Sequence, residues 1–185
     1  MRCFIAACLT QEIKNYLAQI QHTLKNRAHR AKWVNPDNLH ITLKFLGEIK
    51  ENELDAVKNA MAQSISGLKA FAAHLEEFGF FPNLNRPRVF FISAGPSKLI
   101  NPIAQAIKNK MRVLGYHAKI RFHPHITVCR FIEFSHAADV AREIEKITLD
   151  KKIFPIEEIT LLKSTLKTGG STYEKILANR LLPIH

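Results

Sequence analysis

The feature that most constrains this chain is a triplet that occurs twice, as His40-Ile41-Thr42 and as His125-Ile126-Thr127. The copies lie about half of the chain apart, and each opens an apolar run typical of a buried strand. Because a strand alternates its side chains between two faces, each triplet presents an imidazole and a hydroxyl together and turns its isoleucine away. The repeat therefore predicts two similar halves that bring two imidazoles and two hydroxyls together.

The periodicity of the apolar residues predicts strands and helices along the whole chain. Strands are expected over 3–9, 39–46, 69–78, 87–94, 125–131, 153–163 and 171–179, and helices over 11–25, 51–66, 98–113 and 135–147. Thr10 is expected to cap the first helix, and Gly47 to end the second strand. Strands, helices and hairpins are mixed in order, which predicts an α+β architecture in a single domain, residues 1–185.

The chain is strongly basic, with a formal net charge of +11 over 185 residues. Such an excess favours a polyanionic partner, and nucleic acid is the commonest one. No apolar run reaches the length of a membrane span, and the first apolar residues are better interpreted as a buried strand than as a signal sequence. Three cysteines without a Cys-x-x-Cys pair fit a reducing compartment. We expect a cytoplasmic monomer with no membrane partner.

Two imidazoles beside two hydroxyls suit the cleavage of a phosphodiester. In-line displacement needs a base for the nucleophile and an acid for the leaving oxygen, and an imidazole titrates close enough to neutrality to be either. Hydroxyls and a guanidinium can hold the non-bridging oxygens. The scheme requires no metal and no cofactor. The chain also lacks a Gly-x-x-x-x-Gly-Lys-Ser/Thr loop, which argues against the use of ATP.

Longer stretches around the triplets resemble a known family. These are Arg2–Ala6, Trp33-Val34, Asn38–Glu48 (NLHITLKFLGE), Phe78–Pro82, Pro87–Phe90 and Phe122–Arg130 (FHPHITVCR), with Ser164, Gly169 and Tyr173 in a C-terminal hairpin. On these residues the chain resembles the two-histidine (2H) phosphoesterase superfamily. The resemblance is to its RNA 2′,3′-cyclic phosphodiesterase branch, also called the 2′-5′ RNA ligase family.

The resemblance implies a bilobal, pseudo-two-fold fold in which two antiparallel sheets line a central cleft and helices pack outside. It also implies hydrolysis of RNA 2′,3′-cyclic phosphate ends to 2′-phosphates, with ATP-independent ligation to a 2′-5′ linkage as the reverse reaction. By the same analogy His40 is the proton donor, His125 is the proton acceptor, and Thr42, Thr127 and Arg130 bind the phosphate. From the residues alone the two imidazoles are interchangeable.

Strict alternation conflicts with one of these roles, because it turns Arg130 to the face opposite His125. The role of Arg130 therefore requires a bulge or a twist near Cys129. Alternation also places Lys44 on the face of His40, where the lysine could contact an RNA phosphate or remain solvated.

Several alternatives stay open. Cys129 could be a nucleophilic thiol, although a small buried side chain is the simpler interpretation. His123 and His125 could bind a metal on one strand face, but Pro124 and the lack of a nearby ligand set argue against it. The site could also serve a non-catalytic RNA-binding module, or an enzyme that opens a small cyclic nucleotide, because the triplets address the phosphate and not the rest of the ligand.

Overall fold

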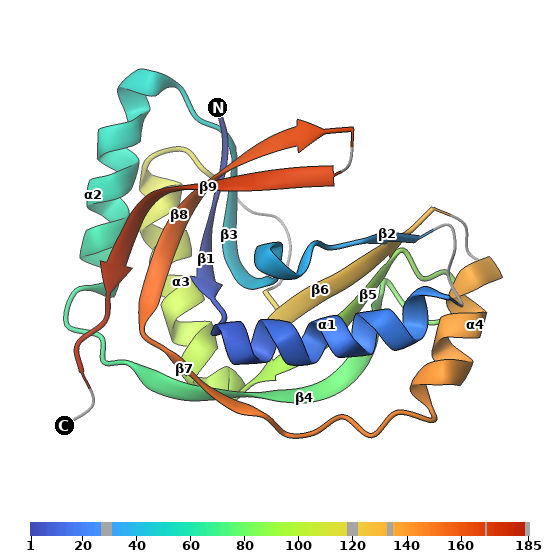
Figure 1. The fold of residues 1–185 in the computed structure, drawn as a ribbon. Helices are drawn as coiled ribbons and strands as arrows, with labels where there is room; N and C mark the ends of the chain where they lie inside the picture. The colour runs from blue at the N-terminus through green and yellow to red at the C-terminus, as the bar shows by residue number, and fades with distance from the viewer. Residues whose placement is uncertain (27–30, 118–121, 133–134, 169, 184–185) are drawn as a thin grey trace.

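The computed structural model describes residues 1–26, 31–117, 122–132, 135–168 and 170–183, so Gly169 lies outside the described residues. In chain order its elements (Figure 1) are β1 (Arg2–Cys8), α1 (Gln11–Lys25), β2 (Ala31–Trp33), η1 (Pro36–Asn38), β3 (His40–Glu48), η2 (Glu51–Glu53), α2 (Leu54–Ile65), β4 (Phe71–Phe81), β5 (Val89–Gly95), α3 (Ser97–Val113), β6 (His125–Phe131), α4 (Ser135–Ile144), β7 (Ile153–Ile156), β8 (Glu158–Lys167) and β9 (Gly170–Arg180).

The strands of the described residues form one curled sheet in the order β7-β4-β5-β6-β3-β1-β8-β9, with β2 paired to β6. All of these strand pairs are antiparallel. The order is symmetric about its middle, where β6 and β3 carry the two triplets and β5 and β1 flank them. The predicted α+β class is thus confirmed. The two sheets that the resemblance implies are joined, through the pair Ile41 and Ile126, into two halves of one sheet.

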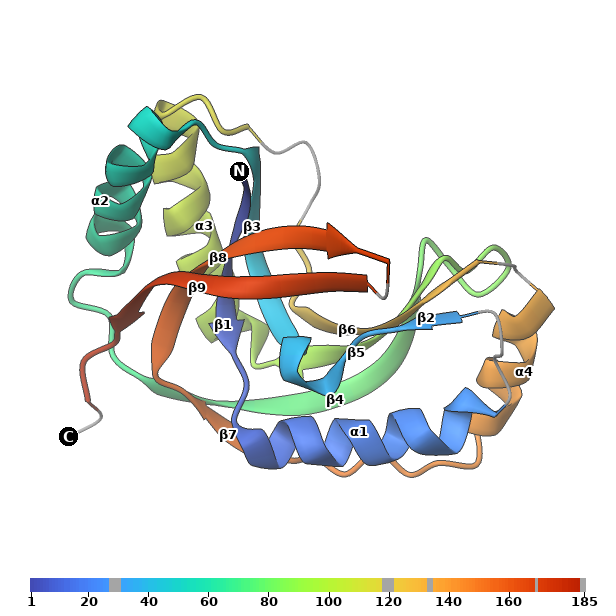
Figure 2. The same ribbon diagram turned by 45° about the horizontal axis from the view of Figure 1, so that its top comes forward.

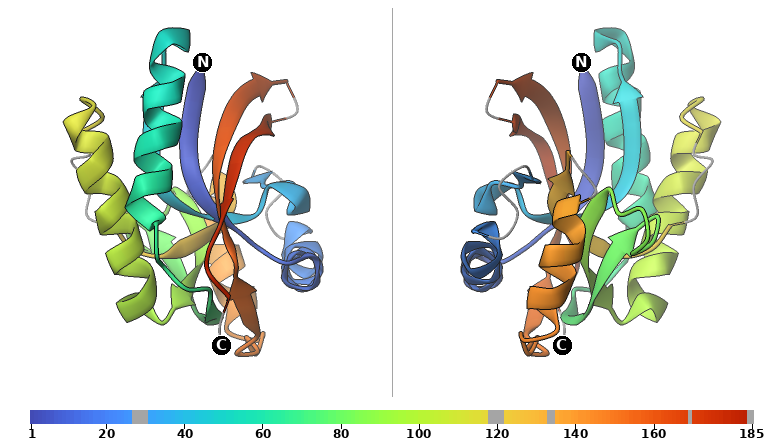
Figure 3. Two further views of the ribbon diagram at one scale, coloured as in Figure 1. Left: turned by 90° about the vertical axis from the view of Figure 1, so that its left-hand side faces the viewer. Right: turned by 90° about the vertical axis from the view of Figure 1, so that its right-hand side faces the viewer.

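The helices form two pairs that lie at opposite ends of the molecule (Figure 1; side views in Figure 3), since α2 packs on α3 and α1 packs on α4. Helix α1 begins where predicted, with the Thr10 side chain accepting a hydrogen bond from the backbone N–H of Ile13 at 3.4 Å. Helix α3 follows β5 but also contacts β3, and α1 follows β1 but contacts β2, which pairs with β6. The helix α3 of the second half of the chain therefore packs on a strand of the first half, and α1 of the first half packs on α4 of the second.

Two elements differ from the sequence-based expectation. The predicted strand 153–163 is divided at Glu157 into β7, which pairs with β4, and β8, which pairs with β1. The chain thus crosses from one half of the sheet to the other within a single apolar run, and local periodicity carries no signal of such a change of partner. Strand β2 lies where the sequence predicts only a polar connection, because three residues are too short for a periodic pattern.

Within the described residues, no helix is long and apolar enough to cross a membrane.

Candidate active site

The pairing of Ile41 with Ile126 places the two triplets side by side on antiparallel strands. Both isoleucines are fully buried, whereas the histidines and threonines of the triplets are half-buried on the other face of the sheet. We call this other face the site face. The predicted convergence of two imidazoles and two hydroxyls is therefore present on it, and the positive charge of a protonated His125 reaches far enough to lower the pKa of His40.

His40 is held on three sides. Its Nδ1 lies 2.6 Å from the backbone oxygen of Asn38, and because a carbonyl oxygen only accepts, Nδ1 carries the proton. Its Nε2 lies 2.8 Å from the hydroxyl of Thr42. The ring packs against Phe4, with centroids 4.9 Å apart, and meets Tyr173 edge-on at 5.4 Å. These contacts fix the ring plane and leave Nε2 as the nitrogen available for chemistry.

His125 is held by an equivalent set of contacts. Its Nδ1–H donates to the backbone oxygen of His123 at 2.7 Å, which again is the residue two positions earlier. Its ring meets Phe81 edge-on at 4.9 Å and Phe91 at 5.4 Å. Phe91 in turn lies directly over Gly79, where any side chain would overlap the aromatic ring. Both halves therefore present an Nε2 atom, and both use an aromatic pair to hold the imidazole.

Burial lowers the pKa of both imidazoles. The pKa of His40 falls to about 4, mainly because burial disfavours the charged ring, and the charges of His125, Lys14 and Arg130 lower it further. Burial also lowers the pKa of His125, and Arg130 again acts in the same direction. Both rings are thus neutral near pH 7 in the free protein. An anion bound between them would favour their protonated forms.

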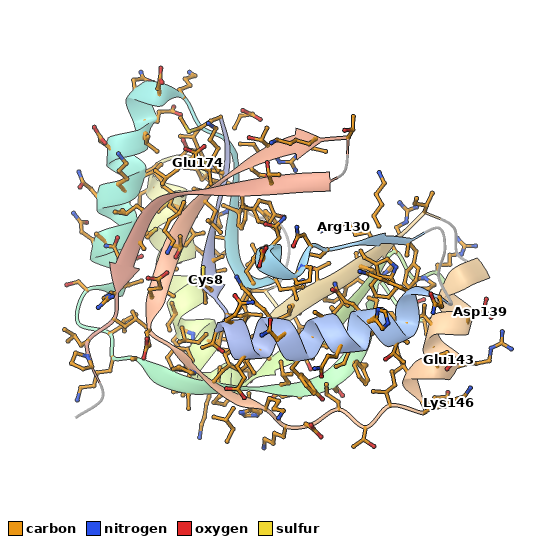
Figure 4. The ribbon with its side chains drawn as sticks, viewed as in Figure 1. Cys8, Arg130, Asp139, Glu143, Lys146 and Glu174 are labelled. Carbon is orange, nitrogen blue, oxygen red and sulfur yellow. The ribbon has the colours of Figure 1, made fainter. Side chains whose placement is uncertain are left out.

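A bulge in β6 brings Arg130 to the site face. The register between β5 and β6 slips so that Phe90 pairs with Cys129 and Phe91 pairs with Thr127, which leaves Val128 as the extra residue. Val128 and Cys129 are both buried, and Arg130 is exposed. The slip reverses the alternation, so that Arg130 shares the face of Thr127, between the β8–β9 hairpin and the β2–β6 pair (Figure 4). The bulge that the role of Arg130 requires is present.

The same bulge occurs in β3 and overturns the expected position of Lys44. Against β1 the register skips Leu43, so that Lys44 turns into the core and Phe45 turns to the site face. Lys44 is only 4% exposed, its ammonium has no hydrogen-bond partner among the described residues, and burial together with Lys108 lowers its pKa. Alternation was wrong here, because it assumes an unbroken strand. Phe45 is instead 62% exposed, and it packs on Phe4.

Gln21 in α1 supports the β6 bulge, and sequence reasoning missed it. Its side-chain amide donates to the backbone oxygen of Val34 at 2.8 Å and to that of Val128 at 3.1 Å, and the backbone N–H of Val34 donates to the same Val128 oxygen. Gln21 is fully buried on the apolar stripe of the helix. A glutamine between Leu17 and Leu24 on such a stripe is the signal that could have identified it.

Asn38 was likewise missed as a positioning residue. Besides accepting from His40, it donates from its side-chain amide to the backbone oxygen of Ser171 at 2.7 Å. This bond connects the segment before His40 to the β8–β9 hairpin, which carries Tyr173. The hairpin projects beside η1 and β3 (Figure 2). The hairpin thereby takes part in holding His40.

The alternative roles for Cys129 and His123 find no support in this geometry. Cys129 is fully buried, and burial raises the pKa of its thiol to about 12, so that a thiolate is strongly disfavoured. His123 is exposed, with its ring centroid 6.4 Å from that of His125. Across the described ranges, no group of three or more His, Cys, Asp or Glu side chains is placed to hold a metal ion.

A family model and curated relatives match this chain. A model of the LigT like Phosphoesterase family matches residues 8–91. An RNA 2′,3′-cyclic phosphodiesterase of Methanocaldococcus jannaschii is 35% identical over 177 residues, which is 95% of this chain and 98% of that protein. One of Thermotoga maritima is 27% identical over 174 residues, 94% of this chain and 92% of that protein.

A solved structure gives the same result for the fold. The crystal structure of TT0787 of Thermus thermophilus matches with a TM-score of 0.81 and 27% identity, and the match covers 100% of both chains. The fold and the paired triplets define a two-histidine phosphoesterase. Within that class, this chain belongs to the LigT-like family, whose curated relatives carry the name RNA 2′,3′-cyclic phosphodiesterase.

Proposed function

We propose that this protein opens RNA 2′,3′-cyclic phosphate ends to 2′-phosphates by acid–base catalysis with two imidazoles. The observation that carries the proposal is the matched pair of Nε2 atoms, from His40 and His125, which share the site face with Arg130. One chain supplies every residue of this arrangement, so a monomer suffices. The scheme uses no metal and no cofactor, because the two rings carry both protons that move.

In this reaction a neutral imidazole removes a proton from water, and the water oxygen attacks phosphorus. The bond from phosphorus to the 3′ oxygen breaks, and a protonated imidazole on the opposite side gives its proton to that oxygen. The 2′ ester bond stays intact, so the product is a 2′-phosphate with a free 3′ hydroxyl. Thr42, Thr127 and Arg130 hold the non-bridging oxygens. When the 5′ hydroxyl of a second RNA takes the place of water, its oxygen bonds to phosphorus as the bond to the 3′ oxygen breaks, and the product is a 2′-5′ linkage formed without ATP.

The resemblance assigns His40 as the donor and His125 as the acceptor. The donor must be protonated, whereas the pKa of His40 in the free protein is low, about 4. The assignment therefore depends on the bound phosphate, whose negative charge next to the buried ring raises its pKa again. Without that charge, His40 would be the better base.

The activity is tested with a short RNA that ends in a 2′,3′-cyclic phosphate, incubated with the protein in the presence of EDTA. We expect ring opening to a 2′-phosphate, identified by its resistance to a 3′-specific phosphatase and by mass. A failure to open the ring, a 3′-phosphate product, or a requirement for a divalent ion would each overturn the proposal.

The two roles are separated with a substrate whose 3′ bridging oxygen is replaced by sulfur. A thiolate leaves without a proton, so the variant that lacks the donor should recover most of its rate on this substrate. We expect recovery in His40→Ala and none in His125→Ala. The opposite pattern would exchange the two roles and leave the overall reaction intact.

A further inference from the structure

Strand β2 places a second cation beside Arg130. Lys32 pairs in register with Arg130, and residues directly opposite each other in an antiparallel pair point to the same side of the sheet. Because the β6 bulge turns Arg130 to the site face, Lys32 lies on that face as well. Both residues are exposed.

Two like charges directly opposite each other destabilise a strand pair. Among the residues that the structure describes, the side chains of Lys32 and Arg130 form neither a hydrogen bond nor an ion pair, so no carboxylate of these residues offsets the repulsion. Strand β2 is nevertheless kept in place by Gln21 and by the backbone bond from Val34 to Val128. A cation pair with no counter-charge among the described residues, on a strand fixed by these bonds, is suited to an anionic ligand.

The position of Lys32 separates it from the reacting phosphate. Arg130 lies four residues along β6 from the Ile41–Ile126 pair, a distance on the order of 10 Å at the usual rise of a strand. The guanidinium reaches back far enough for its charge to lower the pKa of both imidazoles. Lys32 is level with Arg130 on the neighbouring strand, and its charge, unlike that of Arg130, is not among those that lower the pKa of the two imidazoles.

We infer that Lys32 binds the next phosphate of the RNA, the one that links the terminal nucleotide to its 5′ neighbour. An RNA end with a 2′,3′-cyclic phosphate continues only in the 5′ direction, and its second negative charge comes from that phosphodiester. Lys32 and Arg130 thus bind successive phosphates, and Lys32 makes the protein favour RNA chain ends over mononucleotide 2′,3′-cyclic phosphates. The inference rests on the proposed function and names its substrate class.

The test compares two substrates, a trinucleotide with a 2′,3′-cyclic phosphate end and 2′,3′-cyclic AMP. The Lys32→Gln variant should lower the ratio of their kcat/KM values about tenfold, as expected for the loss of one charge-assisted contact. It should also reduce the slope of log(kcat/KM) against log[salt] for the trinucleotide by about 0.7, the value for one phosphate contact on a single strand. Lys32→Arg should restore the ratio.

The matched control is Lys98→Gln, which removes the same charge from an exposed position on α3. It should leave the ratio unchanged. If Lys32→Gln lowers kcat/KM equally for both substrates, or no more than Lys98→Gln does, the inference is wrong.

A failure of the proposed function gives a different result, in which the unaltered protein opens neither substrate. Binding then decides the role of Lys32, measured as the affinity for the 2′-phosphorylated trinucleotide relative to 2′-AMP. A drop in this relative affinity in Lys32→Gln supports the second phosphate contact, and an unchanged relative affinity overturns it.

Discussion

The half of the sheet that carries His40 and the half that carries His125 have the same construction, but they differ in the side chain on the site face after the bulge. In each, the imidazole donates to the carbonyl two residues earlier, and the strand bulges three residues after the histidine. The residue that follows the bulge onto the site face is Phe45 in one half and Arg130 in the other. The shared construction places one imidazole in each half, and the different residue after the bulge makes the two sides of the site unequal.

The difference has a simple electrostatic meaning. The β6 side presents the cation of Arg130, while the β3 side exposes an aromatic ring, that of Phe45, packed on Phe4 next to His40. A symmetric site would bind a phosphodiester in two opposite orientations, only one of which presents the 3′ oxygen to the donor. In the proposed reaction, the guanidinium of Arg130 gives the phosphate a preferred side, and the acid and base roles become distinct.

Loss of either imidazole should have the largest effect. His40→Ala and His125→Ala should each lower kcat about 10²–10⁴-fold, the usual contribution of general acid–base catalysis. Single-turnover rates on the cyclic-phosphate RNA measure this loss. His22→Ala, on the exposed side of α1, serves as the control and should keep full activity. If one of the two site variants keeps full turnover, that histidine transfers no proton and the halves are unequal in chemistry.

The position after the bulge should show the asymmetry directly. Arg130→Met should lower kcat/KM about 10²–10³-fold, as the removal of a single charge-stabilising donor does elsewhere. Phe45→Ala should cost less than about tenfold, because it removes packing and no charge. Steady-state kinetics of the two variants on one substrate decides the matter. Equal losses would show that the two bulged strands contribute alike and that the preferred side is set elsewhere.

The pH dependence should reveal the burial of both rings. The profile of kcat/KM reports the free enzyme, so its bell should lie on the acid side of pH 6.5, since burial lowers the pKa of His125 and brings that of His40 to about 4. On the alkaline side the rate should fall about tenfold per pH unit, because the protonated donor becomes scarce. Arg130→Met should move both limbs upward, since the positive charge of Arg130 lowers both pKa values. Limbs that stay in place would mean that Arg130 does not act on the rings.

Removal of the bulge support should have a moderate effect. Gln21→Met breaks one buried and one partly buried hydrogen bond and leaves the oxygens of Val34 and Val128 with one partner fewer. We expect a loss of about 1–3 kcal/mol in the free energy of unfolding. The bulge positions Arg130, so Gln21→Met should also lower kcat/KM for the RNA substrate. The reduction should exceed that in Leu17→Ala, a core variant that is destabilised but leaves the bulge support intact. Equal activity in the two variants, measured well below their melting temperatures, would show that Gln21 affects only stability and not the geometry of the site.

The smallest effect is expected at the residue that precedes Arg130. Cys129→Ala should keep its turnover, because Cys129 is buried on the core side of the strand and its thiol pKa is about 12. Its counterpart in β3 is Lys44, so that the two halves differ on the core side as well. Initial rates on the cyclic-phosphate RNA provide the measurement. A large loss of turnover in Cys129→Ala would support the alternative that the Cys129 thiol takes part in the reaction.

Much of the site could be predicted from local pattern, and the rest depends on long-range pairing. Alternation within three residues places each histidine with its threonine, and this part of the prediction holds. Arg130 and Lys44 lie beyond the bulges, which arise from the register against β5 and β1, strands distant in sequence. A pattern read along one strand cannot contain that slip.

The same distinction holds for the fold. The helices lie within a few residues of their predicted bounds, because each has a stripe of apolar side chains that is local to it. The division of 153–163 into two strands and the pairing of β2 with β6 are properties of the assembled sheet. Lys32 lies on β2, so its proposed role depends on the pairing of β2 with β6 and could not be predicted from the sequence.

The exchange of helices between the halves has a consequence for how the protein unfolds. Strand β3 is contacted by α3, and β2 of the first half pairs with β6 of the second, around one continuous apolar core. Neither half can open without exposing the core of the other, so thermal melting should be a single cooperative transition. The pair of imidazoles, assembled from two distant stretches of the polypeptide, should therefore be lost in the same transition as the fold.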